Sequence, residues 1–315
     1  MKFNFFLLIG IFFSVFNLYG QNYWQQRADY KMSVKMDVKT FQYQGSQTIN
    51  YTNNSPDTLN KVFFHLFFNA FQPGSEMAVR IKSGADKNTR FKIDIDTLKP
   101  KDIGKLAVLN LKQDGVLIES ELSGTILEVS LNNPIGPNQS TVFSMDFSGQ
   151  VPYMVRRAGK NSRENVALSM AQWFPKLAEY DYDGWNAEPY LGREFHGVWG
   201  SYDVELFIDK KYTVAASGIL QNPEEVGHGY SKTKKGRSKR GLLKWHFIAN
   251  NVHDFTWGAD PDYIHDIYPG PNNVDLHFFY KNDKEIIENW KNLQPKTAEL
   301  MAFFNKTIGP YPYKQ

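Results

Sequence analysis

A side-chain alternation of period two runs through most of this 315-residue chain. Between Tyr30 and Val38, apolar residues occupy every second position and polar residues fill the positions between, which places the two kinds on opposite faces of a strand. The same alternation returns in three later segments: Thr125 to Leu131, Phe143 to Phe147 and Tyr202 to Ile208. Half-buried antiparallel strands have this pattern, so we expect a mainly β fold.

Two further runs, Val62 to Phe68 and Leu276 to Tyr280, are apolar at nearly every position. Such runs predict central strands that are covered on both sides. We expect His65, inside the first run, to be a hydrogen-bonded core residue rather than a ligand. Turn-forming residues, among them Gly45, are interpreted as separators between strands. Because no helical periodicity occurs before about residue 283, the predicted fold is a large antiparallel β-sandwich or saddle.

The segment from Lys284 to Ile308 has a different period. Its apolar residues recur at mostly helical spacing, which predicts an amphipathic helix that Pro295 kinks or splits. These residues are Ile286, Trp290, Leu293, Leu300, Phe304 and Ile308. No later segment is present to bury them, so we expect a β domain over residues 21–282 and, over residues 283–315, the interrupted start of an α-rich second domain.

The first twenty residues have the composition of a secretory signal peptide. Lys2 precedes an apolar run from Phe5 to Phe16, and Gly20 precedes polar residues. A membrane anchor is the alternative, although a span needs about 20 apolar residues. We therefore expect residues 1–20 to be removed from an exported protein that is periplasmic or secreted and has no stable membrane insertion.

Composition excludes several classes of function. The chain has no cysteine, which excludes disulfides and thiolate metal sites. Its net charge of +3 comes from 36 basic and 33 acidic residues, a balance that argues against a nucleic-acid partner. The basic excess is concentrated in one stretch, interpreted as a solvated hairpin loop, with an anionic partner as the alternative. That stretch contains Lys232, Lys234, Lys235, Arg237, Lys239 and Arg240.

Common catalytic signatures are missing from the sequence. It contains no H-E-x-x-H, G-x-S-x-G, G-x-G-x-x-G or G-x-x-x-x-G-K-[ST] pattern. One polar cluster near residues 251–266 supports the hypothesis of a metal-dependent hydrolase that uses His253, Asp260, Asp262 and His265. The alternative is structural, with residues 253–257 on a strand and a turn at Asp260-Pro261-Asp262.

A second cluster is aromatic and acidic, and it spans residues 180 to 186. Tyr180, Tyr182 and Trp185 are the residue types that stack on sugar rings or line an extended groove. They support the alternative hypothesis of a noncatalytic exported β-module that binds carbohydrate or a protein partner. A packed surface loop is the competing interpretation.

Several segments together resemble a known family. These are Phe41 to Ile49, the strand from Leu59 to Leu66, Ala171-Gln172-Trp173-Phe174-Pro175-Lys176, Trp257-Gly258-Ala259-Asp260 and Phe304 to Tyr313. In order and spacing they resemble the aminopeptidase N-like zinc metallopeptidases (gluzincin aminopeptidases), specifically the exported branch found in Bacteroidetes-type bacteria. The resemblance covers nearly all of residues 23–315.

The resemblance implies a β-saddle packed against a thermolysin-like catalytic domain that hydrolyses amino-terminal residues from peptides. In the family, zinc is held by H-E-x-x-H and a distant glutamate, and G-x-M-E-N recognises the substrate amino terminus. None of these motifs lies within the chain, so no catalytic residue or zinc ligand is expected before residue 315, and the chain alone is expected to be inactive. The family's N-terminal domain contributes a glutamine to the substrate pocket. Gln172 is the matching position here, and Lys176 replaces the family's cysteine.

Overall fold

The computed structural model describes residues 23–84, 94–154, 157–192, 196–232 and 241–315. The expected signal peptide lies outside the described residues. Most of the basic stretch near residue 235 also lies outside them. Within the described ranges, no helix is long and apolar enough to cross a membrane.

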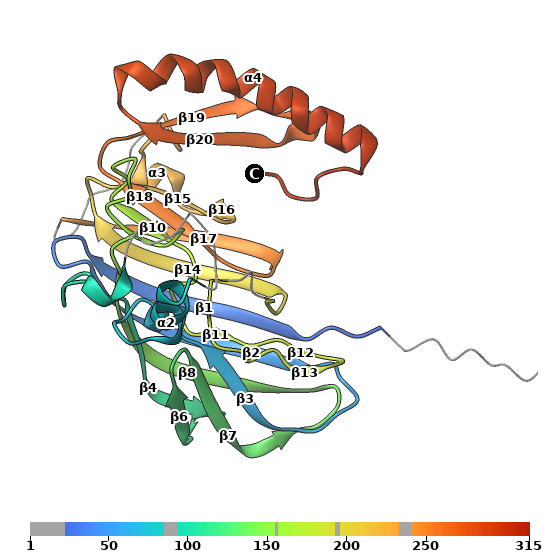
Figure 1. Cartoon of the computed structure of the whole chain (residues 1–315). Coiled ribbons are helices and arrows are strands. Elements are labelled where there is room, and N and C mark those ends of the chain that lie inside the picture. The colour runs from blue at the N-terminus through green and yellow to red at the C-terminus, as the bar shows by residue number, and fades with distance from the viewer. Residues whose placement is uncertain (1–22, 85–93, 155–156, 193–195, 233–240) are drawn as a thin grey trace, which may run out of the picture.

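One large, curved sheet forms the body of the molecule (Figure 1). Its strand order is β16-β17-β14-β1-β2-β8-β4-β5, and every pairing is antiparallel except that of β1 with β14. The strands are β1 (Arg27–Asp37), β2 (Gln42–Asn53), β4 (Lys105–Gln113), β5 (Val116–Leu117), β8 (Gln139–Gln150), β14 (Gly200–Asp209), β16 (Ile219–Leu220) and β17 (Leu242–Val252). The predicted mainly β fold is confirmed.

Two four-stranded sheets pack against one face of the large sheet. One has the order β15-β18-β10-β9 and the other β11-β3-β7-β6. Their strands are β3 (Leu59–His65), β6 (Ser120–Ser123), β7 (Ile126–Ile135), β9 (Gly159–Lys160), β10 (Leu168–Met170), β11 (Lys176–Leu177), β15 (Thr213–Ala216) and β18 (Trp257–Asp260). Aromatic rings fill the space between the layers, as shown by the edge-to-face contacts of Tyr30 with Phe174 and of Phe64 with Phe143.

The period-two segments are buried on the predicted face. Tyr30, Met32 and Val34 alternate with exposed or half-buried neighbours along β1, and so do the inward-facing residues of β8. In β14, buried residues alternate with half-buried ones. Gly45 is not a separator, because it lies inside β2. A Cβ atom there would come within 2.5 Å of the Phe147 ring, so glycine at this position of β2 leaves the space that the ring occupies.

Short helices interrupt the β-rich part, contrary to the prediction of none before residue 283. They are η1 (Phe67–Ala70), α2 (Glu76–Lys82), η2 (Ile95–Thr97), α3 (Pro223–Val226) and η3 (Pro271–Asn273). Ser75 caps α2 by accepting a hydrogen bond from the Ala78 N–H. The apolar run after residue 62 leaves the sheet at η1, where the Asn69 side chain bonds both backbone groups of Leu106.

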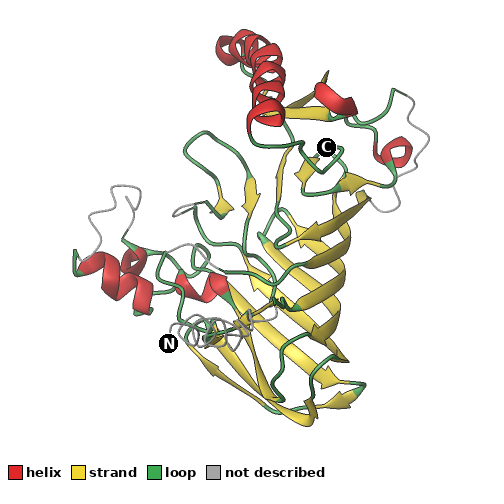
Figure 2. Ribbon diagram, turned by 90° about the vertical axis from the view of Figure 1, so that its right-hand side faces the viewer, coloured by secondary structure: helices red, strands yellow, loops and turns green. Residues whose placement is uncertain are grey.

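A separate hairpin and the long helix complete the chain. Strands β19 (Tyr263–Pro269) and β20 (Asp275–Lys281) pair only with each other among the described strands, and α4 (Lys284–Thr307) lies along them. We call residues 263–307 the hairpin–helix unit. It sits at one end of the large sheet, as Figure 2 also shows. The expectation that β20 is a central strand is therefore wrong, since it has one strand neighbour and is covered by α4.

Helix α4 continues through Pro295, so the predicted split into two helices is wrong, and a kink at Pro295 stays a prediction. Proline removes one backbone donor, but the turns on both sides stay paired, and the Asp283 side chain caps the start by accepting from the Glu285 N–H. The predicted apolar stripe is present and largely exposed: Leu300 is 53% and Ile308 is 81% accessible. The domain bounds at residues 20 and 282 stay predictions.

Candidate functional site

A short segment between β10 and the hairpin of β12 (Tyr180–Asp181) and β13 (Gly184–Trp185) carries several buried polar groups. Gln172, Lys176 and Glu179 are each at most 2% exposed, although they lie among apolar neighbours such as Trp173 and Phe174. Charged residues are almost never fully buried unless they are paired. In this segment, residues 171–179, polar and charged side chains are therefore buried where their residue type predicts exposure.

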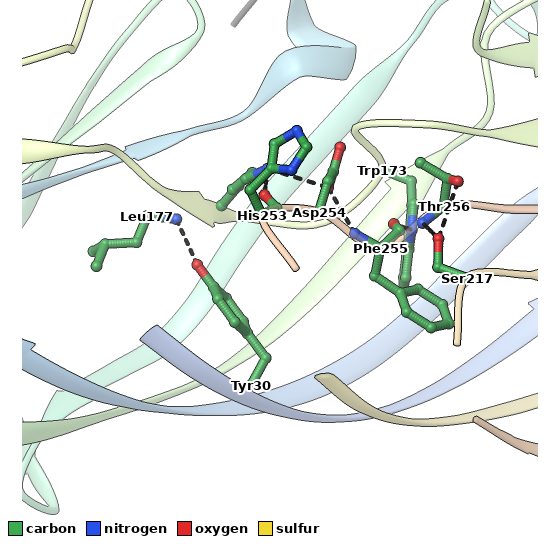
Figure 3. Close-up of polar contacts among 9 residues, drawn as sticks. Tyr30, Trp173, Leu177, Ser217, His253, Asp254, Phe255 and Thr256 are labelled. Atoms are coloured by element: carbon green, nitrogen blue, oxygen red, sulfur yellow. Dashed lines mark hydrogen bonds and ion pairs between the residues drawn. The ribbon is translucent and has the colours of Figure 1, made fainter. Parts of the chain in front are cut away.

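The segment is held by hydrogen bonds from several directions, one of which Figure 3 shows. Trp173 Nε1 donates to the Phe255 carbonyl at 3.1 Å, which joins the segment to the loop between β17 and β18. From the large sheet, Tyr43 Oη donates to the Trp173 carbonyl and Gln47 Nε2 donates to the Pro175 carbonyl at 2.8 Å. These bonds fix the path of the segment through the core.

Lys176 is a buried cation that connects the segment to the loop between β17 and β18. Its Nζ lies 3.2 Å from an Asp254 carboxylate oxygen and donates to the His253 carbonyl at 2.5 Å. Burial lowers the pKa of Lys176, whereas Asp254 opposes that shift by favouring the charged amine. Figure 3 shows His253 and Asp254 in the same region as Leu177, whose N–H donates to Tyr30 Oη.

Glu179 is buried without a complete set of partners. Burial raises its pKa to about 7, and the nearby Asp181 carboxylate contributes in the same direction. Its Oε2 atom has no hydrogen-bond partner among the described residues. The Lys176 ammonium partly opposes this pKa shift, and the His196 Nε2, on a side chain that is about half exposed, lies 4.0 Å from the Glu179 Oε2.

Gln172 lies two residues after the end of β10 and has a left-handed backbone, φ 58°. Its Nε2 is buried and has no acceptor among the described residues. A non-glycine residue in this conformation with an unpaired buried amide is energetically costly. Such a group is suited to donate a hydrogen bond to a carbonyl or carboxylate.

A cavity lies beside this position. It has a volume of about 940 Å³, and residues 169–171 line part of it. Other walls come from β15, β16, β17, β20 and residues 311–315. The last residues are held there by backbone and side-chain bonds: Lys314 accepts from the Asp275 N–H at 3.0 Å, and Tyr313 Oη donates to the Asn251 carbonyl at 2.7 Å. Gln172 itself does not line the cavity.

The polar cluster at residues 251–266 does not form the hypothesised metal site. Within the described ranges, no group of three or more His, Asp or Glu side chains is placed to hold a metal ion. Asp260 and Asp262 both pair with Lys281, at 2.6 and 3.3 Å, and His265 bonds other partners. The turn at Asp260–Asp262 is confirmed, but residues 253–256 form a loop rather than a strand.

The aromatic cluster at residues 180–185 forms a short hairpin, β12 (Tyr180–Asp181) and β13 (Gly184–Trp185). Its rings contact one another or other parts of the chain. Tyr180 packs on Trp185, Trp185 packs on Phe63, and Tyr182 packs on Trp24. Tyr182 is half exposed, so this cluster presents less aromatic surface than the sequence indicates. Binding of carbohydrate or protein here stays a prediction.

His65 and the buried charges differ in how well the sequence indicates them. His65 is buried and its Nε2 lies 3.0 Å from the Asn186 carbonyl, as predicted for a core residue. Burial lowers its pKa to about 4. By contrast, the burial of Lys176 and Glu179 was missed. The sequence contains only one sign of this burial, a charged residue next to an apolar run. That pattern is too common to identify buried charges.

No protein-family model matches the chain, and no curated protein matches its sequence. Solved structures do match its fold. An M1 zinc metallopeptidase from Deinococcus radiodurans is 13% identical with a TM-score of 0.51, over 92% of this chain and 54% of that one. A point mutant of that metallopeptidase, bound to a Tyr-Ser-Ala substrate, gives a TM-score of 0.53 at 13% identity, over 92% of this chain and 55% of that one.

The chain thus spans about 54% of the length of the structures that it matches. At this identity the likeness concerns the fold alone. Residues that could hold zinc are not grouped anywhere in the described ranges, so the metal of those proteins does not fit this part of the chain. The observed β architecture is that of the N-terminal region of M1 zinc metallopeptidases.

Proposed function

We propose that this chain is the N-terminal part of a zinc-dependent aminopeptidase that hydrolyses amino-terminal residues from peptides. The observation that carries the proposal is the fold match over 92% of the chain to M1 zinc metallopeptidases, one of them bound to a Tyr-Ser-Ala substrate. The zinc ligands and the catalytic motifs are proposed to lie beyond residue 315, because the described residues contain no metal-holding group. The 315-residue chain alone is then inactive.

The apolar face of α4 is consistent with a second domain. Leu293, Leu300 and Phe304 are all more than 40% exposed on one helix. Exposed apolar patches of this kind mark contact surfaces. We propose that the chain's own catalytic domain covers this face, and that the cavity beside Ala171 then borders the peptide-binding cleft.

Gln172 is proposed as the substrate-binding residue of this part. Its buried, unpaired amide and its left-handed backbone support the assignment, since strained and unsatisfied groups cluster at binding sites. In the longer gene product, Gln172→Ala should raise KM for a peptide substrate about tenfold, the loss that one hydrogen bond to a charged group predicts. Gln44→Ala, at an exposed position on β2, is the matched control.

Two proteins test the proposed function: the 315-residue chain, and the product of the full reading frame that contains it. Each is titrated with zinc and incubated with Tyr-Ser-Ala. We expect one zinc ion and release of the amino-terminal tyrosine only for the longer product. Stoichiometric zinc and turnover by the 315-residue chain would contradict the proposal, and so would a reading frame that lacks an H-E-x-x-H motif.

Export is part of the proposal, as is membership of the exported Bacteroidetes-type branch. The apolar run after Lys2 and the small residue Gly20 support a cleaved signal peptide. Amino-terminal sequencing of the protein recovered from the periplasm or the medium should begin at Gln21. A product that retains Met1 and stays with the membrane would favour an anchor.

A further inference from the structure

Two histidines meet at the place where the hairpin–helix unit rests on the saddle, by which we mean the large sheet and the two sheets packed on it. His265 lies on β19 and His277 on β20, and the His265 Nε2 is 2.8 Å from the His277 Nδ1. The other nitrogen of His265 is 3.0 Å from the His228 carbonyl, in the loop that follows α3. This loop belongs to the saddle, so the imidazole pair takes part in the contact between the two units.

The hydrogen-bond partners decide which nitrogen carries each proton. A carbonyl can only accept, so the His265 Nδ1 must be the donor to the His228 carbonyl. In the neutral ring, the His265 Nε2 is then an acceptor, and the His277 Nδ1 must donate to it. The pair is therefore complete when both imidazoles are neutral.

Protonation changes this arrangement in two steps. One added proton can be shared, because His277 can move its own proton to Nε2 and accept from His265. A second proton leaves two N–H groups facing each other at a separation of 2.8 Å, with two positive charges in a partly buried place. The pair can therefore hold one extra proton but not two.

The surroundings offer little compensation for a second charge. The Tyr230 ring covers His265, with 4.2 Å between the ring centroids, and the Phe279 ring lies at the same centroid distance from His265. Gly229 packs so closely that a Cβ atom would come within 2.9 Å of the His265 Nδ1. These neighbours cover His265, while both rings stay partly exposed and His277 also borders the cavity.

The charged groups near the pair are Asp266, on β19, and Asp275, at the start of β20. Both favour the protonated rings. Asp266 is engaged elsewhere, since it accepts from Tyr280 Oη and from Gln294 Nε2 at 3.0 Å. His228, on the saddle side, lies 2.9 Å from the Thr213 hydroxyl and 3.1 Å from the Lys210 carbonyl. No carboxylate is recorded in contact with either ring among the described residues.

We propose that the His265–His277 pair is a pH-sensitive joint, which holds the hairpin–helix unit on the saddle while both rings are neutral and releases it when both are protonated. The unit that moves contains α4, the helix with the exposed apolar face. A second polar contact, Lys281 with Asp260, lies at the open end of the hairpin and keeps the unit tethered. The joint therefore loosens without unfolding the saddle.

The direction of titration agrees with the geometry. Burial lowers the pKa of His265 to about 4, and burial also lowers the pKa of His277. A histidine whose pKa is lower in the folded state stabilises the closed form above its unfolded pKa of about 6.5, and that contribution is lost as the pH falls. The joint is closed at neutral pH and opens in the range from about pH 6 to pH 4.

The chain lacks cysteine, so pairs of spin labels can be attached at chosen positions without background. Lys291→Cys on α4 and Lys31→Cys on β1 report the distance between the unit and the saddle. Lys31→Cys with Lys105→Cys on β4 is the control pair within the saddle; all three positions are exposed. Pulsed electron spin resonance between pH 7.5 and 4 gives the distance distributions.

We expect one narrow α4–β1 distance at pH 7.5 and a second, displaced population that exceeds about half at pH 4. The control distance should not change. His277→Gln keeps a donor for His265 but removes one charge, so its distribution should stay closed over the same range. His246→Gln, on β17 and outside the joint, should behave like the parent.

Nuclear magnetic resonance of the parent chain gives a second measurement that needs no substitution at the joint. The imidazole protons of His265 and His277 should titrate in two separated steps below pH 6.5. Independent titration of both rings near pH 6.5, or an α4–β1 distance that is constant down to pH 4, would overturn the proposal. Equal opening in the parent and in His277→Gln would also overturn it, because the second charge would then have no effect.

Discussion

The saddle and helix α4 each carry a continuous apolar face, but their surroundings differ. In the saddle, the inward residues of β1, β2, β8 and β14 are covered by two smaller sheets, and large rings such as Trp173 and Tyr202 are fully buried. On α4, Leu293, Phe303 and Phe304 face outward with more than 40% of their surface exposed. The same kind of side chain therefore contributes to stability in one region and is available for contact in the other.

The largest expected loss of stability comes from a substitution in the core of the saddle, at Trp173. Its ring contacts those of Tyr43, Phe174 and Trp257 inside the saddle. Trp173→Ala should lower the free energy of unfolding by about 3–5 kcal/mol, because it removes a buried ring and leaves a cavity. Urea denaturation followed by circular dichroism measures the change. A loss below about 1 kcal/mol would mean that the saddle is not packed as described.

The buried ion pair is the next test, with an exposed pair as its control. Lys176→Met should cost about 3 kcal/mol in unfolding free energy, because the Asp254 carboxylate, whose side chain is 11% exposed, loses its cation. Lys61→Met breaks a pair with Glu128 in which both side chains are about half exposed, and it should cost less than about 1 kcal/mol. Similar losses for the two variants would argue against the burial of Lys176.

The comparison also shows what could be predicted from sequence. Strands β1, β7, β8 and β14 follow from period-two patterns, because each buries one face and the pattern is local. The parallel pairing of β1 with β14 joins residues about 170 positions apart, and nothing local specifies it. Helix α2 has only seven residues, too few for a periodicity to stand out, and only the Ser75 cap indicates its start.

The candidate site was harder to predict than the fold. Gln172 was identified through a family resemblance, whereas the burial of Lys176 and Glu179 depends on the loop at residues 253–256 and on the N-terminal strand. The His265–His277 pair was missed as well, because residues 12 apart meet only once β19 and β20 form a hairpin. Long-range contacts decide burial, and burial decides the chemistry of these groups.

A pH-dependent effect of intermediate size is expected at Glu179. Its pKa is raised to about 7 in the folded state by burial, above its ordinary value of 4.5, so ionisation destabilises the fold progressively as the pH rises from 4.5 to 7. Glu179→Gln should therefore be more stable than the parent at pH 8, by about 2 kcal/mol, and nearly equal at pH 4. Denaturation at both pH values measures the difference, and a constant difference would show that Glu179 is not buried in its acidic form.

The smallest change in stability is expected for a substitution on the exposed face of α4. Leu300 is 53% exposed, so Leu300→Gln should change the free energy of unfolding of the 315-residue chain by less than about 0.5 kcal/mol. In the longer gene product, where we propose that a second domain covers this face, the same substitution should cost about 1–2 kcal/mol because apolar area is lost from a contact. Thermal denaturation of both proteins measures the two values.

An equal, small cost in both would leave the helix face exposed in the longer protein as well, and the proposed domain contact would have to lie elsewhere. A larger cost in the longer protein would show that the helical pattern serves a contact between domains, whereas the period-two pattern serves the core of the saddle.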